Sequence, residues 1–237
     1  MKMRNYLLSA TANYKVKLTE EQINMFEVYF DLLVEWNKKL NLTAITDDMG
    51  VAIKHFADSL SILNYINIPE NARVIDVGTG AGFPGLVLKI VRPDIELTLL
   101  DSLKKRFLFL EEVTNRLDLE AVFLQGRAEK YGNDLDCREA YDLAVSRAVA
   151  NLNTLSEYCL PLIRLSGTFA AFKGSGADEE IASAKKAISI LGGKIKNTYS
   201  FKLPYNCGQR TIVCIEKVQP TPEKYPRNNG KIKSKPL

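Results

Sequence analysis

Apolar residues recur at helical spacing through the first part of the chain. Between Ile23 and Leu40 they follow the period of 3.6 residues that buries one face of a helix, and Thr19 and Gln22 have the spacing of a capping box just before it. The same pattern returns between Ile53 and Leu63. We therefore expect residues 1–70 to form a helical cap that contains no strand.

After residue 70 the pattern changes to short apolar runs separated by helical segments. The runs begin at Arg73, Ile95, Ala121, Tyr141, Gly167, Lys194 and Arg210, and helical spacing covers residues 85–91, 103–117, 151–165 and 178–191. Such alternation predicts an α/β fold in which helices cover both faces of a mostly parallel sheet of these seven strands. Only the Pro204–Gly208 turn separates the last two runs, so we expect them to form an antiparallel pair at one edge.

The composition is that of an ordinary globular protein with one main core, since 46% of the 237 residues are hydrophobic and 25% are charged. We expect three parts: the cap (1–70), an α/β core (71–217) and a basic C-terminal arm (218–237). No apolar run approaches the length of a membrane span, and the first residues make a poor signal peptide, so a cytoplasmic location is expected. The four cysteines form no C-x-x-C pair and His55 is the only histidine, so no metal site is expected.

Positive charge is concentrated at the end of the chain. Residues 217–237 hold six basic residues and one acidic residue, while the net charge of the whole chain is +4. The rest of the protein is therefore nearly neutral. A basic, proline-containing arm of this kind is typical of a contact with an anionic polymer, and a merely solubilising tail is the alternative.

The first strand of the predicted sheet runs into a glycine-rich turn, VIDVGTGAGFPG, in which Gly78, Gly80 and Gly82 are spaced as G-x-G-x-G. Glycines at a strand-to-helix junction let the backbone approach a ligand closely. Phe83 stands where a dinucleotide fingerprint has its third glycine, which disfavours NAD. Asp101 ends the next strand and has the place of a carboxylate that accepts hydrogen bonds from both ribose hydroxyls.

Two further segments extend this predicted pocket. Residues 126–129 follow the third strand, where a loop can lie against an adenine ring, and Asp76 in the first strand can receive an ammonium group or serve as a strand-end capping acid. Together these positions describe a pocket for adenosine joined to an amino acid. That ligand is S-adenosyl-L-methionine.

With those residues identified, the sequence closely resembles the RsmG (GidB) family of bacterial 16S rRNA guanine-N7 methyltransferases. The resemblance rests on NLTAIT, HFADSL, VIDVGTGAGFPG, LLDSLKKRFLFLEEV, GRAE, YDLAVSRAVA, FKG and the terminal KYPRNNGKIKSKPL, in family order. It implies a Rossmann-like class I methyltransferase fold and, as partner, 16S rRNA, the small ribosomal subunit or one of its assembly intermediates. It also implies cofactor contacts at Gly78, Phe83, Ala128, Glu129 and Arg147, with Asp101, Ser102 and Leu103 at the ribose edge.

Motifs for other methyl acceptors are missing from the sequence. Methylation of an amino group usually needs an (Asn/Asp/Ser)-Pro-Pro-aromatic motif after the fourth strand, where this chain reads Ser146, Arg147, Ala148 and Val149. Methylation of cytosine carbon 5 needs a nucleophilic cysteine, commonly beside proline, and no cysteine is so placed. Guanine nitrogen 7 exposes a lone pair, so its methylation needs positioning and no general base.

The remaining candidates would face the substrate. Arg127 and Arg147 follow strands beside the pocket and are candidates for positioning the reaction, with surface salt bridging as the alternative. The substrate-binding candidates are Asn41 (or a turn cap), His55 and Asp58 (or helix packing), Lys173, Arg210 and, on the basic arm, Arg227. The rival functions are a small-molecule methyltransferase and a non-catalytic RNA-binding factor on the same scaffold.

Overall fold

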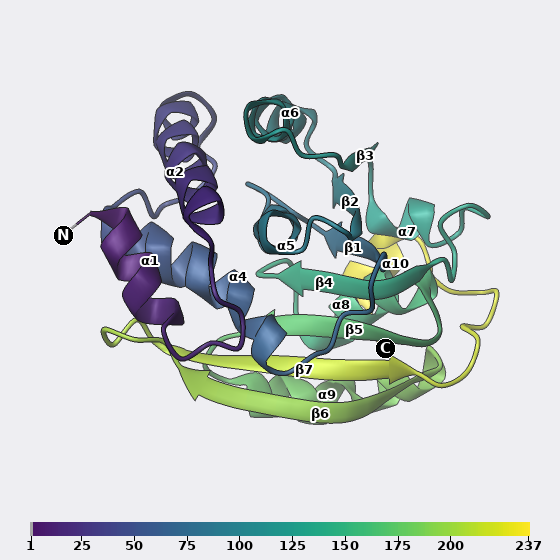
Figure 1. Cartoon of the computed structure of the whole chain (residues 1–237). Helices are drawn as coiled ribbons and strands as arrows, with labels where there is room; N and C mark the ends of the chain where they lie inside the picture. The colour runs from purple at the N-terminus through teal and green to yellow at the C-terminus, as the bar shows by residue number, and fades with distance from the viewer. Residues whose placement is uncertain (1) are drawn as a thin grey trace.

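The computed structural model describes residues 2–237 and contains a seven-stranded sheet in the order β3-β2-β1-β4-β5-β7-β6 (Figure 1). The strands are β1 (Arg73–Val77), β2 (Glu96–Asp101), β3 (Val122–Gln125), β4 (Tyr141–Arg147), β5 (Ile163–Lys173), β6 (Gly193–Lys202) and β7 (Gln209–Lys217). β1 to β5 pair in parallel, and β7 runs antiparallel to both β5 and β6. The expected sheet and its antiparallel edge pair are therefore confirmed.

Helices cover both faces of the sheet, and each face has its own apolar core. Neighbouring residues of a strand point to opposite faces, so Val74 joins one core and Ile75 the other. The first core also contains α5 (Gly85–Val91), α6 (Lys104–Leu117) and the N-terminal helices. The second contains α8 (Leu152–Cys159) and α9 (Ala177–Ile190), with α7 (Ala128–Tyr131) packed against it.

The N-terminal region is helical, as the sequence predicts. Helix α2 (Glu20–Leu40) begins at the expected capping box, in which the Thr19 hydroxyl accepts a hydrogen bond from Gln22 N and the Gln22 side chain accepts one from Thr19 N. The second expected helix is broken into α3 (Asp48–Gly50), a π-helical segment η1 (Val51–Ala57), α4 (Asp58–Leu60) and η2 (Ser61–Asn64). π-Helical turns are rare in proteins, and those that do occur are often found at functional sites.

Helix α1 (Met3–Thr11) was not expected from the sequence. Its buried apolar stripe is only Met3, Leu7 and Ala10, too short a pattern to stand out along the chain. The helix is held by packing against η1 and by a hydrogen bond of 2.6 Å from Met3 N to the Asp48 carboxylate. Tertiary contacts therefore stabilise a helix whose own sequence signal is weak.

The predicted helix over residues 151–165 was too long. Helix α8 ends at Cys159, a 3-10 turn η3 (Leu160–Leu162) follows, and Ile163 already belongs to β5. Pro161 has no backbone N–H and cannot continue an α-helix, so the chain turns there and enters the sheet. β5 is longer than the apolar run that predicted it.

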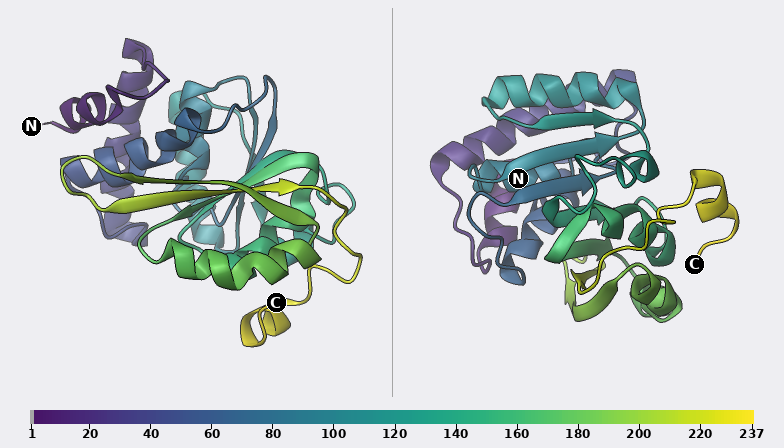
Figure 2. Two further views of the ribbon diagram at one scale, coloured as in Figure 1. Left: turned by 90° about the horizontal axis from the view of Figure 1, so that it is seen from below. Right: turned by 90° about the vertical axis from the view of Figure 1, so that its right-hand side faces the viewer.

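The C-terminal residues do not extend away from the protein as a free arm. After β7 the chain forms the short helix α10 (Asn229–Ser234), which packs on α8 and stands at the rim of the molecule (Figure 2). No helix within residues 2–237 is long and apolar enough to cross a membrane.

Candidate active site

A cleft of about 1160 Å³ opens at the carboxyl ends of β1 to β5. This is the edge at which open α/β sheets bind their ligands. The predicted residues that line the cleft are His55, Asp58, Gly78, Gly80, Phe83, Asp101, Ser102, Arg127, Ala128, Glu129, Arg147, Lys173 and Arg210. The structure therefore brings together most of the candidates from distant parts of the sequence.

The glycine-rich turn forms the floor of this cleft. Gly78, Gly80 and Gly82 have φ angles of 75°, 62° and 91°, in the left-handed region that other residues rarely adopt. A Cβ atom on Gly80 would meet only the Gly78 carbonyl oxygen, at 4.0 Å, so the backbone there borders open space in the cleft. Gly82 does not line the cleft, because it packs beneath the turn against Tyr29 and Leu86.

Asp76 also lies beneath the turn and does not line the cleft. It is fully buried, and its Oδ2 accepts hydrogen bonds from Thr79 Oγ1 at 2.7 Å and from Gly85 N at 2.9 Å. Its Oδ1 has no hydrogen-bond partner within the described chain. Burial raises the pKa of this carboxyl from 3.8 to about 6, because desolvation disfavours the charged form more than the two hydrogen bonds favour it.

This raised pKa predicts a distinctive pH dependence of stability. The folded protein keeps the Asp76 proton up to about pH 6, whereas the unfolded chain releases it near 3.8, so the free energy of unfolding contributed by this group falls as the pH rises through that window. The whole fall is equivalent to about 3 kcal/mol. The side chain of an Asp76→Asn variant cannot titrate, so this variant should lack that pH-dependent fall in the free energy of unfolding.

The measurement is urea unfolding of both proteins at several values between about pH 4 and about pH 7. His55, whose pKa is lowered in the folded protein, contributes a slope of opposite sign to both, so the difference between the two curves isolates Asp76. Parallel curves would show that Asp76 stays ionised in the folded protein.

Asp101 is the acidic residue at the end of β2 and is almost fully buried. Its Oδ2 accepts hydrogen bonds from Gly80 N at 3.0 Å and Arg106 Nη1 at 2.6 Å, and its Oδ1 accepts one from Leu103 N at 2.9 Å. A carboxylate has about four lone-pair sites, so one remains for a ligand while Arg106 stays in place. The exposed Leu103 side chain does not line the cleft.

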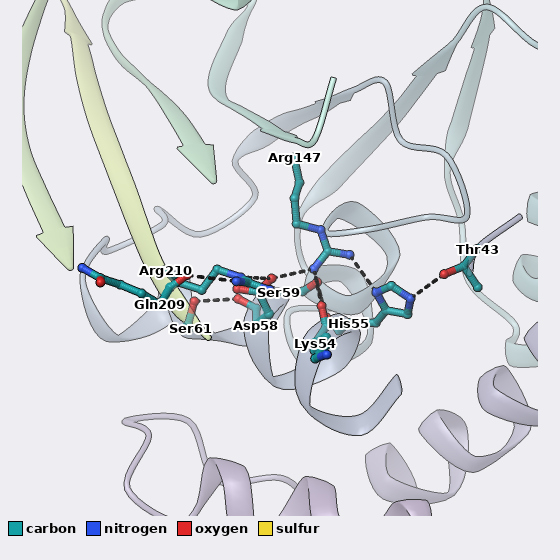
Figure 3. A network of polar contacts seen from close by, with 9 residues as sticks. All are labelled: Thr43, Lys54, His55, Asp58, Ser59, Ser61, Arg147, Gln209 and Arg210. Carbon is teal, nitrogen blue, oxygen red and sulfur yellow. Dashed lines mark hydrogen bonds and ion pairs between the residues drawn. The ribbon is translucent and has the colours of Figure 1, made fainter. Parts of the chain in front are cut away.

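A polar network joins the N-terminal helices to the sheet at the opposite end of the cleft (Figure 3). Asp58 Oδ2 lies 3.0 Å from Arg147 Nη1 and 3.1 Å from Arg210 Nε, so one carboxylate holds two arginines that come from β4 and β7. The Asp58 side chain is only 1% exposed, and its Oδ1 has no partner among residues 2–237. Arg147 Nη1 also donates to the Lys54 carbonyl at 3.0 Å.

His55 extends this network to the loop between α2 and α3. Its Nδ1 lies 3.4 Å from Arg147 Nη2, and its Nε2 lies 2.9 Å from Thr43 Oγ1. A guanidinium can only donate, so Nδ1 is the acceptor and Nε2 carries the proton toward Thr43. Burial, followed by the nearby charge of Arg147, lowers the pKa of His55 to about 3, so the ring is neutral near pH 7.

Phe83 lies beside this network and joins it to the glycine turn. The His55 ring stacks on the Phe83 ring with centroids 4.6 Å apart, and the Arg147 guanidinium lies 5.2 Å from the Phe83 centroid. Phe83 is therefore a packed platform under both polar groups.

The other predicted residues have identifiable places. Lys173 Nζ is paired with Glu180 at 2.7 Å and donates to the Ala150 carbonyl at 2.7 Å, while Arg127 precedes α7 with an exposed side chain. Asn41 ends α2 in the left-handed conformation, away from the cleft lining. Arg227 does not line the cleft either, because its guanidinium is bonded to the buried Glu157.

The sequence analysis did not single out several residues that line the cleft, among them Thr43, Lys54, Arg106, Thr154, Tyr158, Asn229, Lys233 and Pro236. Arg106 and Lys54 lie close in sequence to Asp101 and His55, and that proximity was the available signal. Asn229, Lys233 and Pro236 lie in the terminal segment that carries part of the family resemblance, but only the folded chain brings them to the cleft. No group of three or more His, Cys, Asp or Glu side chains within residues 2–237 is arranged to hold a metal ion, and the four cysteines are buried free thiols.

Comparison with known proteins shows the family to which the chain belongs. The model of the family described as rRNA small subunit methyltransferase G matches residues 22–213. The chain belongs to this family. A ribosomal RNA small subunit methyltransferase G from Acetivibrio thermocellus is 49% identical over 238 residues, covering 100% of this chain and 98% of the relative. Its counterpart in Bacillus subtilis is 45% identical over 230 residues, covering 97% of this chain and 96% of the relative.

Solved structures of more distant proteins share the fold. The YcgJ protein of Bacillus subtilis superposes with a TM-score of 0.54 at 13% identity, covering 70% of this chain and 100% of the other. A chain of the fibrillarin/Nop5p complex has a TM-score of 0.52 at 16% identity, covering 68% of this chain and 80% of the other. The Rossmann-like fold and the family resemblance expected from the sequence are confirmed, and a member of the rRNA small subunit methyltransferase G family is an rRNA methyltransferase with a methyl donor of the S-adenosylmethionine type.

Proposed function

We propose that this chain transfers the methyl group of S-adenosyl-L-methionine to nitrogen 7 of one guanine in 16S rRNA. The substrate in this proposal is the small ribosomal subunit or one of its assembly intermediates, and the reaction takes place in the cytoplasm, where bacterial ribosomes are assembled. The observation that carries the proposal is the cleft at the carboxyl ends of β1 to β5 in a chain of this family.

The donor set of the cleft fits an adenosyl cofactor. Asp101 offers a free lone-pair site to a ribose hydroxyl, Gly78 and Gly80 let the backbone come close, and Ala128 and Glu129 border the space beyond β3. Ser102 completes the ribose edge. When bound, S-adenosyl-L-methionine supplies an electrophilic methyl group attached to a positively charged sulfur.

The neutral state of His55 supports nitrogen 7 as the acceptor. With a pKa near 3, this imidazole is too weak a base to remove a proton at neutral pH, while Asp58 and Glu180 are each committed to cations. Nitrogen 7 of guanine carries a lone pair and needs no deprotonation. The protein then only has to bind the guanine, orient it toward the methyl group and exclude water. In this proposal Arg147 and Arg127 position the base, and Lys173 and Arg210 lie near the RNA backbone.

The test is methylation of 16S rRNA and of small subunits prepared from cells that lack the gene, followed by nucleoside analysis. The expected product is 7-methylguanosine at a single position, and S-adenosylhomocysteine should raise the melting temperature of the free protein while NAD should not. A different methylated nucleoside would reject the nitrogen 7 assignment. Stabilisation by NAD alone would reject the cofactor.

A further inference from the structure

The C-terminal segment, residues 227–237, forms part of the cleft wall. Asn229, Lys233 and Pro236 line the cleft together with Tyr158 of α8. The segment is anchored by Ile232, which is fully buried in the core between the sheet and α8. The segment that the sequence predicts as a basic arm therefore packs against the protein along the cleft.

A buried ion pair holds this segment in place. Arg227 Nη2 lies 2.6 Å from Glu157 Oε2, and Arg227 Nε and backbone N each donate to Glu157 Oε1 at 2.9 Å. Glu157 lies on α8 with its side chain only 1% exposed. Releasing the segment would take away the counter-charge of this carboxylate and three hydrogen bonds that it accepts, which is costly. The Arg227 guanidinium also donates to the Lys235 carbonyl at 3.1 Å, so the same residue holds the chain beyond α10.

The loop after α7 guides the chain into this position. Arg138 donates to the carbonyl oxygens of Thr221 and Tyr225, at 2.7 Å and 2.8 Å, and the Asn133 amide donates to the Pro226 carbonyl at 3.1 Å. The path between β7 and α10 is therefore fixed by side chains that follow β3. This is the end of the cleft that holds Arg127, Ala128 and Glu129.

The side chain of Asn229 is oriented by α8. The Tyr158 hydroxyl donates to Asn229 Oδ1 at 2.7 Å, and within the described chain no acceptor engages Asn229 Nδ2. An amide nitrogen has two N–H donors, and the ring nitrogens of a purine are acceptors. Asn229 lines the cleft, so these unused donors belong to a residue at the cleft wall.

We propose that residues 227–237 form the wall of the cleft at the adenine end of the methyl donor, with Asn229 as a binding residue and Arg227 as the positioning residue that holds the wall. This inference rests on the proposed function, because it assumes that the cofactor lies across β1, β2 and β3. It makes cofactor affinity depend on the C-terminal segment, whereas a basic arm would affect RNA affinity alone.

The test measures binding of S-adenosylhomocysteine to the full-length chain by calorimetry and binding of 16S rRNA by filter retention. Asn229→Ala should raise the dissociation constant for S-adenosylhomocysteine about fivefold, the scale of one hydrogen bond, and Arg227→Gln at least as much. Lys231→Gln is the matched control, since it removes a tail charge from an exposed residue outside the cleft lining and should change this constant less than about twofold. Arg227→Lys, which keeps the charge but not the two-pronged contact, should fall between wild type and Arg227→Gln.

Two outcomes would overturn the inference. Unchanged cofactor affinity in Asn229→Ala, with or without weaker RNA binding, would show that the segment is no part of the cofactor site. This variant decides the matter even if Arg227→Gln fails to fold, because Asn229 is only partly buried. A wild-type chain that binds no S-adenosylhomocysteine would instead reject the proposed function itself.

Discussion

Asp58→Asn should lower the free energy of unfolding by about 3 kcal/mol, because it removes the almost fully buried carboxylate that Arg147 and Arg210 share. The same change should lower the rate of methyl transfer at least roughly tenfold, equivalent to about 1.4 kcal/mol, because both arginines lose the group that orients them beside the cleft. The measurements are urea unfolding and single-turnover methylation on one preparation.

Glu112→Gln is the matched control for this substitution. Glu112 faces Arg116 across one turn of α6 at 3.6 Å, with side chains that are 36% and 60% exposed. Loss of this solvent-screened pair should change stability by less than about 0.5 kcal/mol and leave methyl transfer unchanged. Equal effects of the two substitutions would contradict a special role for Asp58, and a stable but inactive Asp58→Asn protein would assign it to positioning alone.

The second large effect is expected at Gly82. An alanine there has to adopt a φ of 91°, and its Cβ would collide with the Tyr29 hydroxyl and lie 2.7 Å from Leu86 Cδ1. Tyr29 is fully buried and bonded to the Ala81 carbonyl, so it cannot yield. We expect a loss of about 3 to 5 kcal/mol from backbone strain and overpacking, which corresponds to a fall in melting temperature of roughly 10 °C.

Gly80→Ala makes the same chemical change two residues earlier and separates stability from binding. Its φ of 62° costs an alanine about 1 kcal/mol, and its Cβ meets no atom nearer than 4.0 Å. The methyl group would enter the cleft, so the dissociation constant for S-adenosylhomocysteine should rise at least roughly tenfold in a protein that stays folded. Similar melting temperatures for the two variants would contradict this account of the turn.

Local sequence chemistry determined most of the architecture. The alternation of apolar runs with helical spacing reveals the sheet and its helices, since each element must bury one face whatever its neighbours are. Gly78, Gly80 and Asp101 are found for a related reason, because a parallel sheet gathers the ends of its first strands at one edge. The boundary at Pro161 was misplaced because Ile163 and Leu165, at the start of β5, continue the apolar spacing of the preceding helix, and helical and strand spacing look alike over a few residues.

Only the tertiary structure revealed the contacts between segments that are far apart in the chain. Asp58 meets Arg210 across 152 residues, Arg147 meets the His55 ring across 92, and Glu157 captures Arg227 across 70. None of these pairs can be predicted from the sequence, because two ionic partners from different segments have no fixed separation along the chain. A basic C-terminal tail has the composition of a solvated arm, and only tertiary contacts, among them the buried carboxylate of Glu157 and the burial of Ile232, place it along the cleft.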